Sequence, residues 1–269
     1  MVQNKTHAVM SQRHEDKDSK DYFPTPPWAT RALFKVLEKK WHIPEMFTGK
    51  YSYIDCLEPA CGAGHMAKVL KEYFHTVVSA DIDDFGQDRI ADFLKTDEKD
   101  KYHYIITNPP FNLAEEFVLK ALRQAKFCVA VFARTQFLES VGRYERLFTP
   151  NPPNFVAQFT ERVPILKGKL SATASTATSY AWFVWKGYAD EDKEKNTELL
   201  WIPPCRSQLE RDGDYEESLD ATYPRSTGHA SQRNLFTEDL RYFTLANRQK
   251  PVVKTLKFGN FYFVSPCLY

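Results

Sequence analysis

The sequence predicts an α/β fold in which a mostly parallel sheet carries helices on both faces. Short apolar runs alternate with segments of helical spacing, and a glycine-rich loop separates the first run from the first helix. We expect strands at residues 53–57, 75–80, 89–94, 102–106 and 127–132, and helices at residues 65–74 and 114–125. Because parallel strands of an open sheet end at one edge, the loops after them should meet there and form the ligand site.

The glycine-rich loop, EPACGAG at residues 58–64, stands between the first strand and the first helix. Glycines let a backbone approach a bound ligand closely. The spacing Gly62-x-Gly64-x-x-Ala67 also satisfies the dinucleotide fingerprint, so this loop alone fits a nicotinamide cofactor or S-adenosylmethionine equally well.

The next two strands end in acidic residues. Asp81, followed by Ile82, ends the second strand, where a carboxylate can hold the ribose hydroxyls of either cofactor. The third strand carries Asp92 and Phe93, which suit an adenine amine and an adenine face. A loop acid and a core phenylalanine are the alternative interpretation of this pair.

The fourth strand ends in the tetrapeptide NPPF, residues 108–111. The Asn108 side-chain oxygen and the Pro109 carbonyl could accept hydrogen bonds from an amine and stabilise the charge that develops when it attacks a methyl group. Pro109 and Pro110 fix φ and carry no N–H, which makes the loop stiff, and Phe111 offers a flat stacking surface. An ordinary strand-to-helix turn is the alternative for the tetrapeptide alone. A nicotinamide enzyme, however, has no evident use for it at this position.

Together these motifs resemble those of S-adenosylmethionine-dependent DNA adenine methyltransferases, in particular small orphan enzymes of bacteria and phages, over roughly the first 190 residues. The resemblance implies a Rossmann-like class I methyltransferase fold with a seven-stranded sheet. Ala60 stands where glycine is commoner in that family. The implied cofactor contacts are Thr25, Pro26, Glu58, Ala60, Gly62, Gly64, Asp81, Ile82, Asp92, Phe93 and Asn108, and the implied catalytic residues are Asn108, Pro109, Pro110 and Phe111.

Residues 21–30 resemble the aromatic-x-Thr-Pro segment that in this family caps the methionine carboxylate of the cofactor. Their position before the glycine loop matches the motif order of the gamma group. Thr25 and the two prolines after it also predict a helix start. Both interpretations can hold, since a helix N-terminus is a natural carboxylate site.

The resemblance implies methyl transfer from S-adenosylmethionine to the exocyclic amine of adenine in DNA, on a base flipped out of the helix and without a metal. The same tetrapeptide leaves open methylation of RNA adenine or of protein glutamine. A noncatalytic nucleic-acid-binding relic of the fold is a further alternative. A connection with phage biology or restriction-modification is also expected.

Composition predicts one domain with an extension, because the chain has 269 residues, 43% of them hydrophobic. We expect a flexible N-terminus at residues 1–20, the methyltransferase domain at 21–189, and a C-terminal extension at 190–269 that is a candidate for substrate contact. Five widely spaced cysteines argue against a zinc site and a disulfide framework. With no signal-peptide core and no membrane-length apolar run, a soluble, cytoplasmic protein is expected.

The C-terminal half is predicted to close the sheet with two antiparallel strands, in residues 154–165 and 179–185. The tail changes charge: residues 190–220 hold eleven acids against four Lys and Arg, and residues 223–269 hold seven Lys and Arg against two acids. Aromatic residues alternate with these cations, which could follow nucleic-acid phosphates. A surface hairpin turning at Gly259-Asn260 is an equal alternative. The formal net charge of +1 means that nucleic-acid affinity would depend on a local patch.

Overall fold

The computed structural model describes residues 22–41, 54–97, 101–173, 176–188 and 196–215, together with the strands 253–258 and 261–266. The chain divides into two compact units, Met1–Thr222 and Tyr223–Tyr269.

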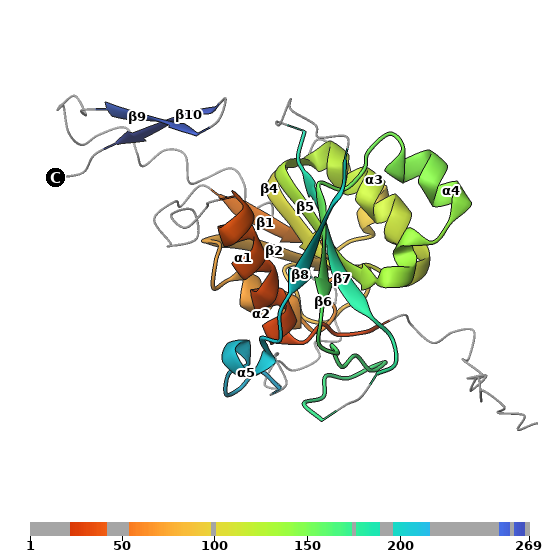
Figure 1. The fold of residues 1–269 in the computed structure, drawn as a ribbon. Coiled ribbons are helices and arrows are strands. Elements are labelled where there is room, and N and C mark those ends of the chain that lie inside the picture. The colour runs from red at the N-terminus through yellow and green to blue at the C-terminus, as the bar shows by residue number, and fades with distance from the viewer. Residues whose placement is uncertain are drawn as a thin grey trace, which may run out of the picture. The chain divides into compact units, whose positions relative to one another are not determined.

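The first unit is built on an eight-stranded sheet in the order β3-β2-β1-β4-β5-β7-β6-β8 (Figure 1). Neighbours from β3 to β5 are parallel, whereas β7 is antiparallel to both β5 and β6. The strands are β1 (Asp55–Glu58), β2 (Thr76–Asp81), β3 (Arg89–Ile90), β4 (Tyr102–Thr107), β5 (Ala125–Arg134), β6 (Phe155–Phe159), β7 (Tyr180–Lys186) and β8 (Glu198–Ile202).

This topology is the Rossmann-like class I methyltransferase fold, and it confirms the predicted fold class. The sheet has eight strands and not the predicted seven. The additional strand is β8, which pairs in parallel with β6 and lies in the acidic stretch that the sequence suggested was an extension. The first compact unit therefore continues past residue 189, where the predicted domain ended.

Helices cover both faces of the sheet, as Figure 1 shows for α1 and α2 on one side and α3 on the other. Each face of the sheet has its own hydrophobic cluster, and successive side chains of β7 point to opposite faces. Trp182 and Val184 belong to the cluster under α1, and Phe183 and Trp185 belong to the cluster under α3. The helices are α1 (Pro27–Trp41), α2 (His65–Leu70), α3 (Ala114–Gln124), α4 (Val141–Arg143) and α5 (Arg206–Leu209). The 3-10 turns are η1 (Phe93–Lys95), η2 (Phe111–Leu113) and η3 (Thr135–Leu138), and η4 (Tyr144–Phe148) is a π-helical turn.

Three predicted elements are shorter than expected. The helix predicted to reach residue 74 ends at Leu70, and Tyr73 instead stacks on Phe34 of α1 with 3.7 Å between ring centroids. The strand predicted at 89–94 stops at Ile90, because the Asp92 side chain accepts a hydrogen bond from the Leu94 N–H and caps η1. The strand predicted at 154–165 covers only Phe155–Phe159. By contrast, α1 begins at Pro27, as the Thr-Pro-Pro sequence predicted.

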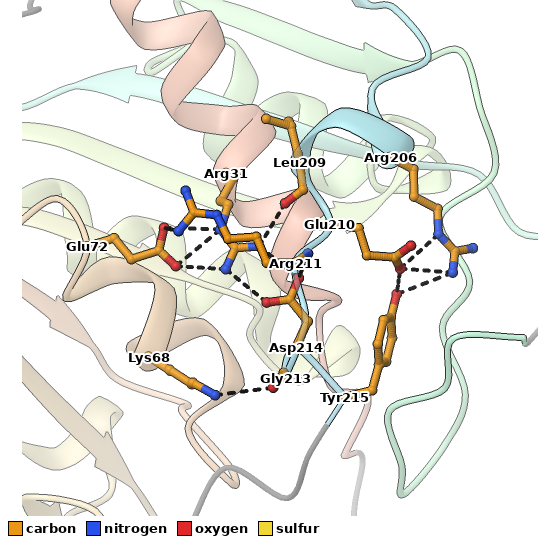
Figure 2. A network of polar contacts seen from close by, with 10 residues as sticks. All are labelled: Arg31, Lys68, Glu72, Arg206, Leu209, Glu210, Arg211, Gly213, Asp214 and Tyr215. Atoms are coloured by element: carbon orange, nitrogen blue, oxygen red, sulfur yellow. Dashed lines mark hydrogen bonds and ion pairs between the residues drawn. The ribbon is translucent and has the colours of Figure 1, made fainter.

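An ion-pair network attaches the segment after β8 to the first two helices (Figure 2). Arg31 of α1 is only 4% exposed and donates to both Glu72 and Asp214, at 2.7 and 2.8 Å. Arg211 also contacts Glu72, at 2.8 Å, and Lys68 of α2 donates to the Gly213 carbonyl at 3.3 Å. The network joins parts of the chain up to 183 positions apart. It therefore makes residues 209–214 part of the layer formed by α1 and α2.

The second unit contains an antiparallel hairpin of β9 (Val253–Phe258) and β10 (Phe261–Pro266). Phe258 pairs with Phe261, so the hairpin reverses between them, as predicted. The basic residues Arg225, Arg233, Arg241, Arg248 and Lys250 lie outside the described residues.

Candidate active site

A cavity of about 270 Å³ opens at the carboxyl ends of β1, β2 and β4. Its walls include nine of the predicted site residues, namely Thr25, Glu58, Ala60, Asp81, Ile82, Asp92, Phe93, Asn108 and Pro110. The predicted residues that do not line it are Pro26, Gly62, Gly64, Pro109 and Phe111. The edge of the sheet at which the sequence placed the ligand loops is therefore the edge that holds this cavity.

The two predicted glycines do not line the cavity but lie in the turn between β1 and α2. Gly62 has φ +49°, and its N–H donates to Asp81 Oδ2 at 2.8 Å. A β-carbon at Gly62 would lie 2.2 Å from the ring of Tyr22, so only glycine admits this ring. Gly64, with φ +79°, ends the turn immediately before α2. Gly62 thus allows the close approach of the Tyr22 ring, and Gly64 allows the tight turn before α2.

Glu58 is a buried acid with an unused oxygen. Its side chain is 2% exposed, and Oε2 has no hydrogen-bond partner among the described residues. Burial raises the pKa of Glu58 well above its usual value, and the nearby Asp81 charge raises it further. A cationic group of a ligand would satisfy this oxygen and stabilise the ionised form.

Asp81 is held in place by two backbone donors. Oδ2 accepts from Gly62, and Oδ1 accepts from the Asp83 N–H at 3.1 Å. A carboxylate has roughly four acceptor positions, so two remain for ligand hydroxyls. Ile82, 62% exposed, follows it on the cavity wall.

Asp92 and Phe93 have structural partners as well as places on the cavity wall. Asp92 caps η1 and pairs with Lys95 at 2.8 Å, and the hydrogen bond from Lys95 lowers the pKa of Asp92. Phe93 is 4% exposed, and its ring centroid lies 5.0 Å from that of Phe117. Both residues therefore make the structural contacts of the alternative interpretation, a loop acid and a core phenylalanine, and also line the cavity.

Asn108 is fixed in one orientation with its oxygen unpaired. Its Nδ2 donates to the Phe23 carbonyl at 2.7 Å and to Thr25 Oγ1 at 3.0 Å. A backbone carbonyl can only accept, so the amide nitrogen must point toward Phe23. Oδ1 is buried and has no partner among the described residues. The side chain therefore presents a free acceptor where β4 ends.

Of the other three residues of the tetrapeptide, only Pro110 lines the cavity. Pro109 is buried, and no described residue donates a hydrogen bond to its carbonyl. Phe111 is half-buried, with its ring centroid 5.0 Å from that of Phe23 and 4.1 Å from the guanidinium carbon of Arg134.

The structure adds site residues that the sequence did not single out. Tyr22 and Phe23 line the cavity, as do His65 and Met66 at the start of α2. The signal for the first two was present, because two aromatic residues stand directly before the Pro-Thr-Pro sequence. Burial raises the pKa of Tyr22 and lowers that of His65. His65 is therefore biased toward its neutral form.

The described part of the chain has neither a metal-binding cluster nor a membrane-spanning helix. It contains no group of three His, Cys, Asp or Glu side chains arranged to hold a metal ion. None of its helices combines the length and the apolarity needed to cross a membrane.

Comparison with known proteins found no matching family model and no matching curated protein. Solved structures do match. A protein from Vibrio vulnificus YJ016, described as a modification subunit of a type I restriction enzyme, aligns over 67% of this chain with 13% identity and a TM-score of 0.45. The chain spans about half, 47%, of that subunit's length.

Two further structures align over most of their own length. A Pyrococcus horikoshii protein described as an RNA methyltransferase matches 64% of this chain and 90% of its own, with 15% identity and a TM-score of 0.44. A TehB-like SAM-dependent methyltransferase from Corynebacterium glutamicum matches 60% of this chain and 86% of its own, with 11% identity and a TM-score of 0.37. The function proposed for this chain rests on its own side chains.

Proposed function

We propose that this chain transfers a methyl group from S-adenosylmethionine to the exocyclic amine of adenine in DNA. The observation that carries the proposal is the unpaired, buried Oδ1 of Asn108 beside the cavity. An unsatisfied buried acceptor costs free energy, about 1–3 kcal/mol, unless a ligand pairs with it. An amine donor is the ligand that this oxygen suits.

The cavity residues fit the proposed cofactor. S-adenosylmethionine, when bound, supplies an electrophilic methyl group on a sulfonium centre. The unpaired Glu58 Oε2 suits the ammonium of its methionine half, and the free acceptor positions of Asp81 suit its ribose hydroxyls. Asp92 and Phe93 line the same cavity and would contact its adenine.

The reaction follows from the position of the Asn108 oxygen. Asn108 Oδ1 and the Pro109 carbonyl accept the two hydrogens of the target amine and draw its lone pair out of the ring. A bound S-adenosylmethionine would supply the methyl group with a neutral thioether as its leaving group, and Asn108 and Pro109 would hold the amine nitrogen in position to form the new bond to the methyl carbon. The methylated nitrogen then loses its proton to water, which requires no strong base.

Phe111 supports a flat substrate ring in this proposal. Its half-buried ring lies next to the Asn108 loop and beside Phe23, so a base flipped out of a helix would find an aromatic surface there. A protein glutamine has an amine-bearing amide but no ring to stack. The aromatic surface therefore favours a nucleobase. DNA is proposed over RNA on the sequence resemblance.

The test is incubation with methyl-labelled cofactor and unmethylated DNA, RNA or protein extract, followed by mass spectrometry of nucleosides and amino acids. We expect N6-methyladenine in DNA. Label found only in RNA or only in glutamine would show that the substrate is RNA or protein and not DNA. Failure to bind S-adenosylmethionine would support a noncatalytic relic.

A pair of variants tests the mechanism. Asn108→Ala should abolish methylation while leaving cofactor binding measurable. Asn112→Ala changes an exposed asparagine outside the cavity walls and serves as the matched control, with activity near that of the native chain. Equal activity of the two variants would overturn the role of Asn108.

A further inference from the structure

Arg134, at the end of β5, stacks on the aromatic residue of the tetrapeptide. Its guanidinium carbon lies 4.1 Å from the centroid of the Phe111 ring and 5.6 Å from that of Phe23. Phe23 also supplies the carbonyl that orients Asn108. The guanidinium thus belongs to the same cluster as the proposed amine-binding site.

Arg134 has no anionic partner in the part of the chain that the structure describes. Its side chain makes no ion pair or hydrogen bond there, and its Nε is buried without an acceptor. Arg143 stacks on Phe137 at 4.3 Å and also has a buried Nε without a hydrogen-bond partner. It differs in that its Nη1 donates to the Phe137 carbonyl and its Nε lies 4.0 Å from a carboxylate oxygen of Glu115. Leaving a guanidinium with an unpaired buried N–H is costly. Its position is best explained if a substrate completes its contacts.

The stacked position of Arg134 conflicts with the proposed reaction. Phe111 also packs against the hydrophobic cluster that contains Tyr180, and the Arg134 guanidinium carbon lies 4.1 Å from its ring centroid, so both contacts take up surface of the ring. A base stacked on Phe111 needs that surface. Positive charge also develops on the amine during methyl transfer, and a cation stacked on the same ring would oppose it.

We propose that Arg134 holds the place of the target base on Phe111, and that the entering base displaces the guanidinium onto a phosphate of the nucleic acid. A guanidinium and a base are both flat and both stack on aromatic rings, so one can replace the other. A phosphate then supplies the acceptors that Arg134 lacks in the free protein. This inference rests on the proposed function and deepens it, because it requires a substrate with both a base and a phosphate.

The displacement can be observed directly by NMR of arginine side chains. In the free protein the Arg134 Nε–H signal should be shifted by the ring current of Phe111, and the shift should disappear in Phe111→Leu. Saturation with unmethylated duplex DNA and S-adenosylhomocysteine should remove the shift in the native chain. The Arg143 signal, which lies over Phe137, should stay in place. An Arg134 signal that keeps its shift on saturation would overturn the proposal.

A second measurement tests the phosphate contact. The dependence of DNA affinity on salt should become shallower in Arg134→Met by about 0.9 in the log–log slope, the value for one lost phosphate contact. A purely structural arginine would not change this slope. S-adenosylhomocysteine affinity, measured in parallel, shows whether the variant is folded. If the native chain methylates adenine in DNA while Arg134→Met keeps the native slope, this inference fails and the proposed function stands. If the native chain does not methylate DNA, the proposed function fails.

Discussion

The Asn108 side chain lies against Thr25, a residue 83 positions earlier in the chain, with 3.0 Å between Nδ2 and Oγ1. Thr25 is itself 3% exposed, so this hydrogen bond is shielded from water. A residue predicted to contact the cofactor thus also orients the residue predicted to bind the amine. The two proposed subsites are linked by one hydrogen bond.

Thr25→Val should therefore reduce turnover. Valine keeps the shape but removes the acceptor, so the Asn108 amide loses one of its two anchors. We expect kcat/KM to fall by up to about 10-fold, in line with one neutral hydrogen bond. Thr30→Val is the matched control, because the buried Thr30 hydroxyl has no partner among the described residues and its loss should be neutral or stabilising. Steady-state kinetics of both variants measure the difference, and equal losses would contradict the positioning role.

Glu58→Gln should weaken cofactor binding by roughly 10- to 100-fold, the range expected for a hydrogen bond to a charged group. The raised pKa of Glu58 adds a pH dependence. A bound cation lowers that pKa, so binding to the native chain should release protons, and affinity should rise as the pH increases toward the pKa of the free protein. Calorimetry in buffers of different ionisation enthalpy measures this release. Unchanged proton release in Glu58→Gln would exclude Glu58 as its source.

The same variant should stabilise the cofactor-free protein at neutral and higher pH. Because burial raises the folded pKa of Glu58 above its unfolded value, the native chain keeps this part of its stability at low pH. It loses that part as the pH rises through the folded pKa. A glutamine side chain does not ionise, so Glu58→Gln should not lose stability in this pH range. Urea unfolding at several pH values tests this, and a native chain whose stability rises over the same range would contradict it.

Gly62→Ala should impair the site more than Gly64→Ala. Both glycines have positive φ, so each substitution carries backbone strain of about 1–2 kcal/mol. Only at Gly62 would the new methyl group meet a neighbour, the Tyr22 ring at 2.2 Å, whereas nothing lies within 4 Å at Gly64. We expect cofactor affinity to fall further in Gly62→Ala. Isothermal titration measures both variants, and a larger loss in Gly64→Ala would show that strain outweighs the contact with Tyr22.

Arg31→Met should destabilise the protein by about 3–5 kcal/mol, because it leaves the buried Asp214 and the partly buried Glu72 without their main cation. Lys35→Met removes an exposed pair with Glu38 on the same helix and should change stability by no more than about 0.5 kcal/mol. Urea titration compares the two variants. If Arg31→Met lowers the free energy of unfolding by less than about 1 kcal/mol, Arg211 must pair with both Glu72 and Asp214 in the variant.

The positions of most strands along the chain, and the edge of the sheet where their loops meet, could be predicted from the sequence, because glycine and proline loops interrupt the apolar runs where strands β1 and β4 end. The length of β3 could not, since the Asp92 side chain competes with the sheet for the Leu94 N–H. β8 contains the apolar run Leu199-Leu200-Trp201-Ile202 and was missed because this run lies within an acidic stretch that was assigned to an extension. As an edge strand it leaves Leu199 and Trp201 exposed.

The sequence predicted nine of the residues that line the cavity, but not the contacts between their side chains. Glu58, Asp81 and Asn108 could be named from motifs. The hydrogen bond between Asn108 and Thr25 and the stacking of Arg134 on Phe111 depend on how distant segments pack. Side-chain pairs of this kind leave no periodic pattern in the sequence.

The ion-pair network around Arg31 also determines where the chain can be cut for expression. A fragment that stopped at residue 189 would lose Asp214 and with it one carboxylate partner of the buried Arg31. It would also lose β8 and leave the backbone groups of β6 open to pairing with other chains. A fragment meant to fold and stay monodisperse should therefore retain at least residues 22–215.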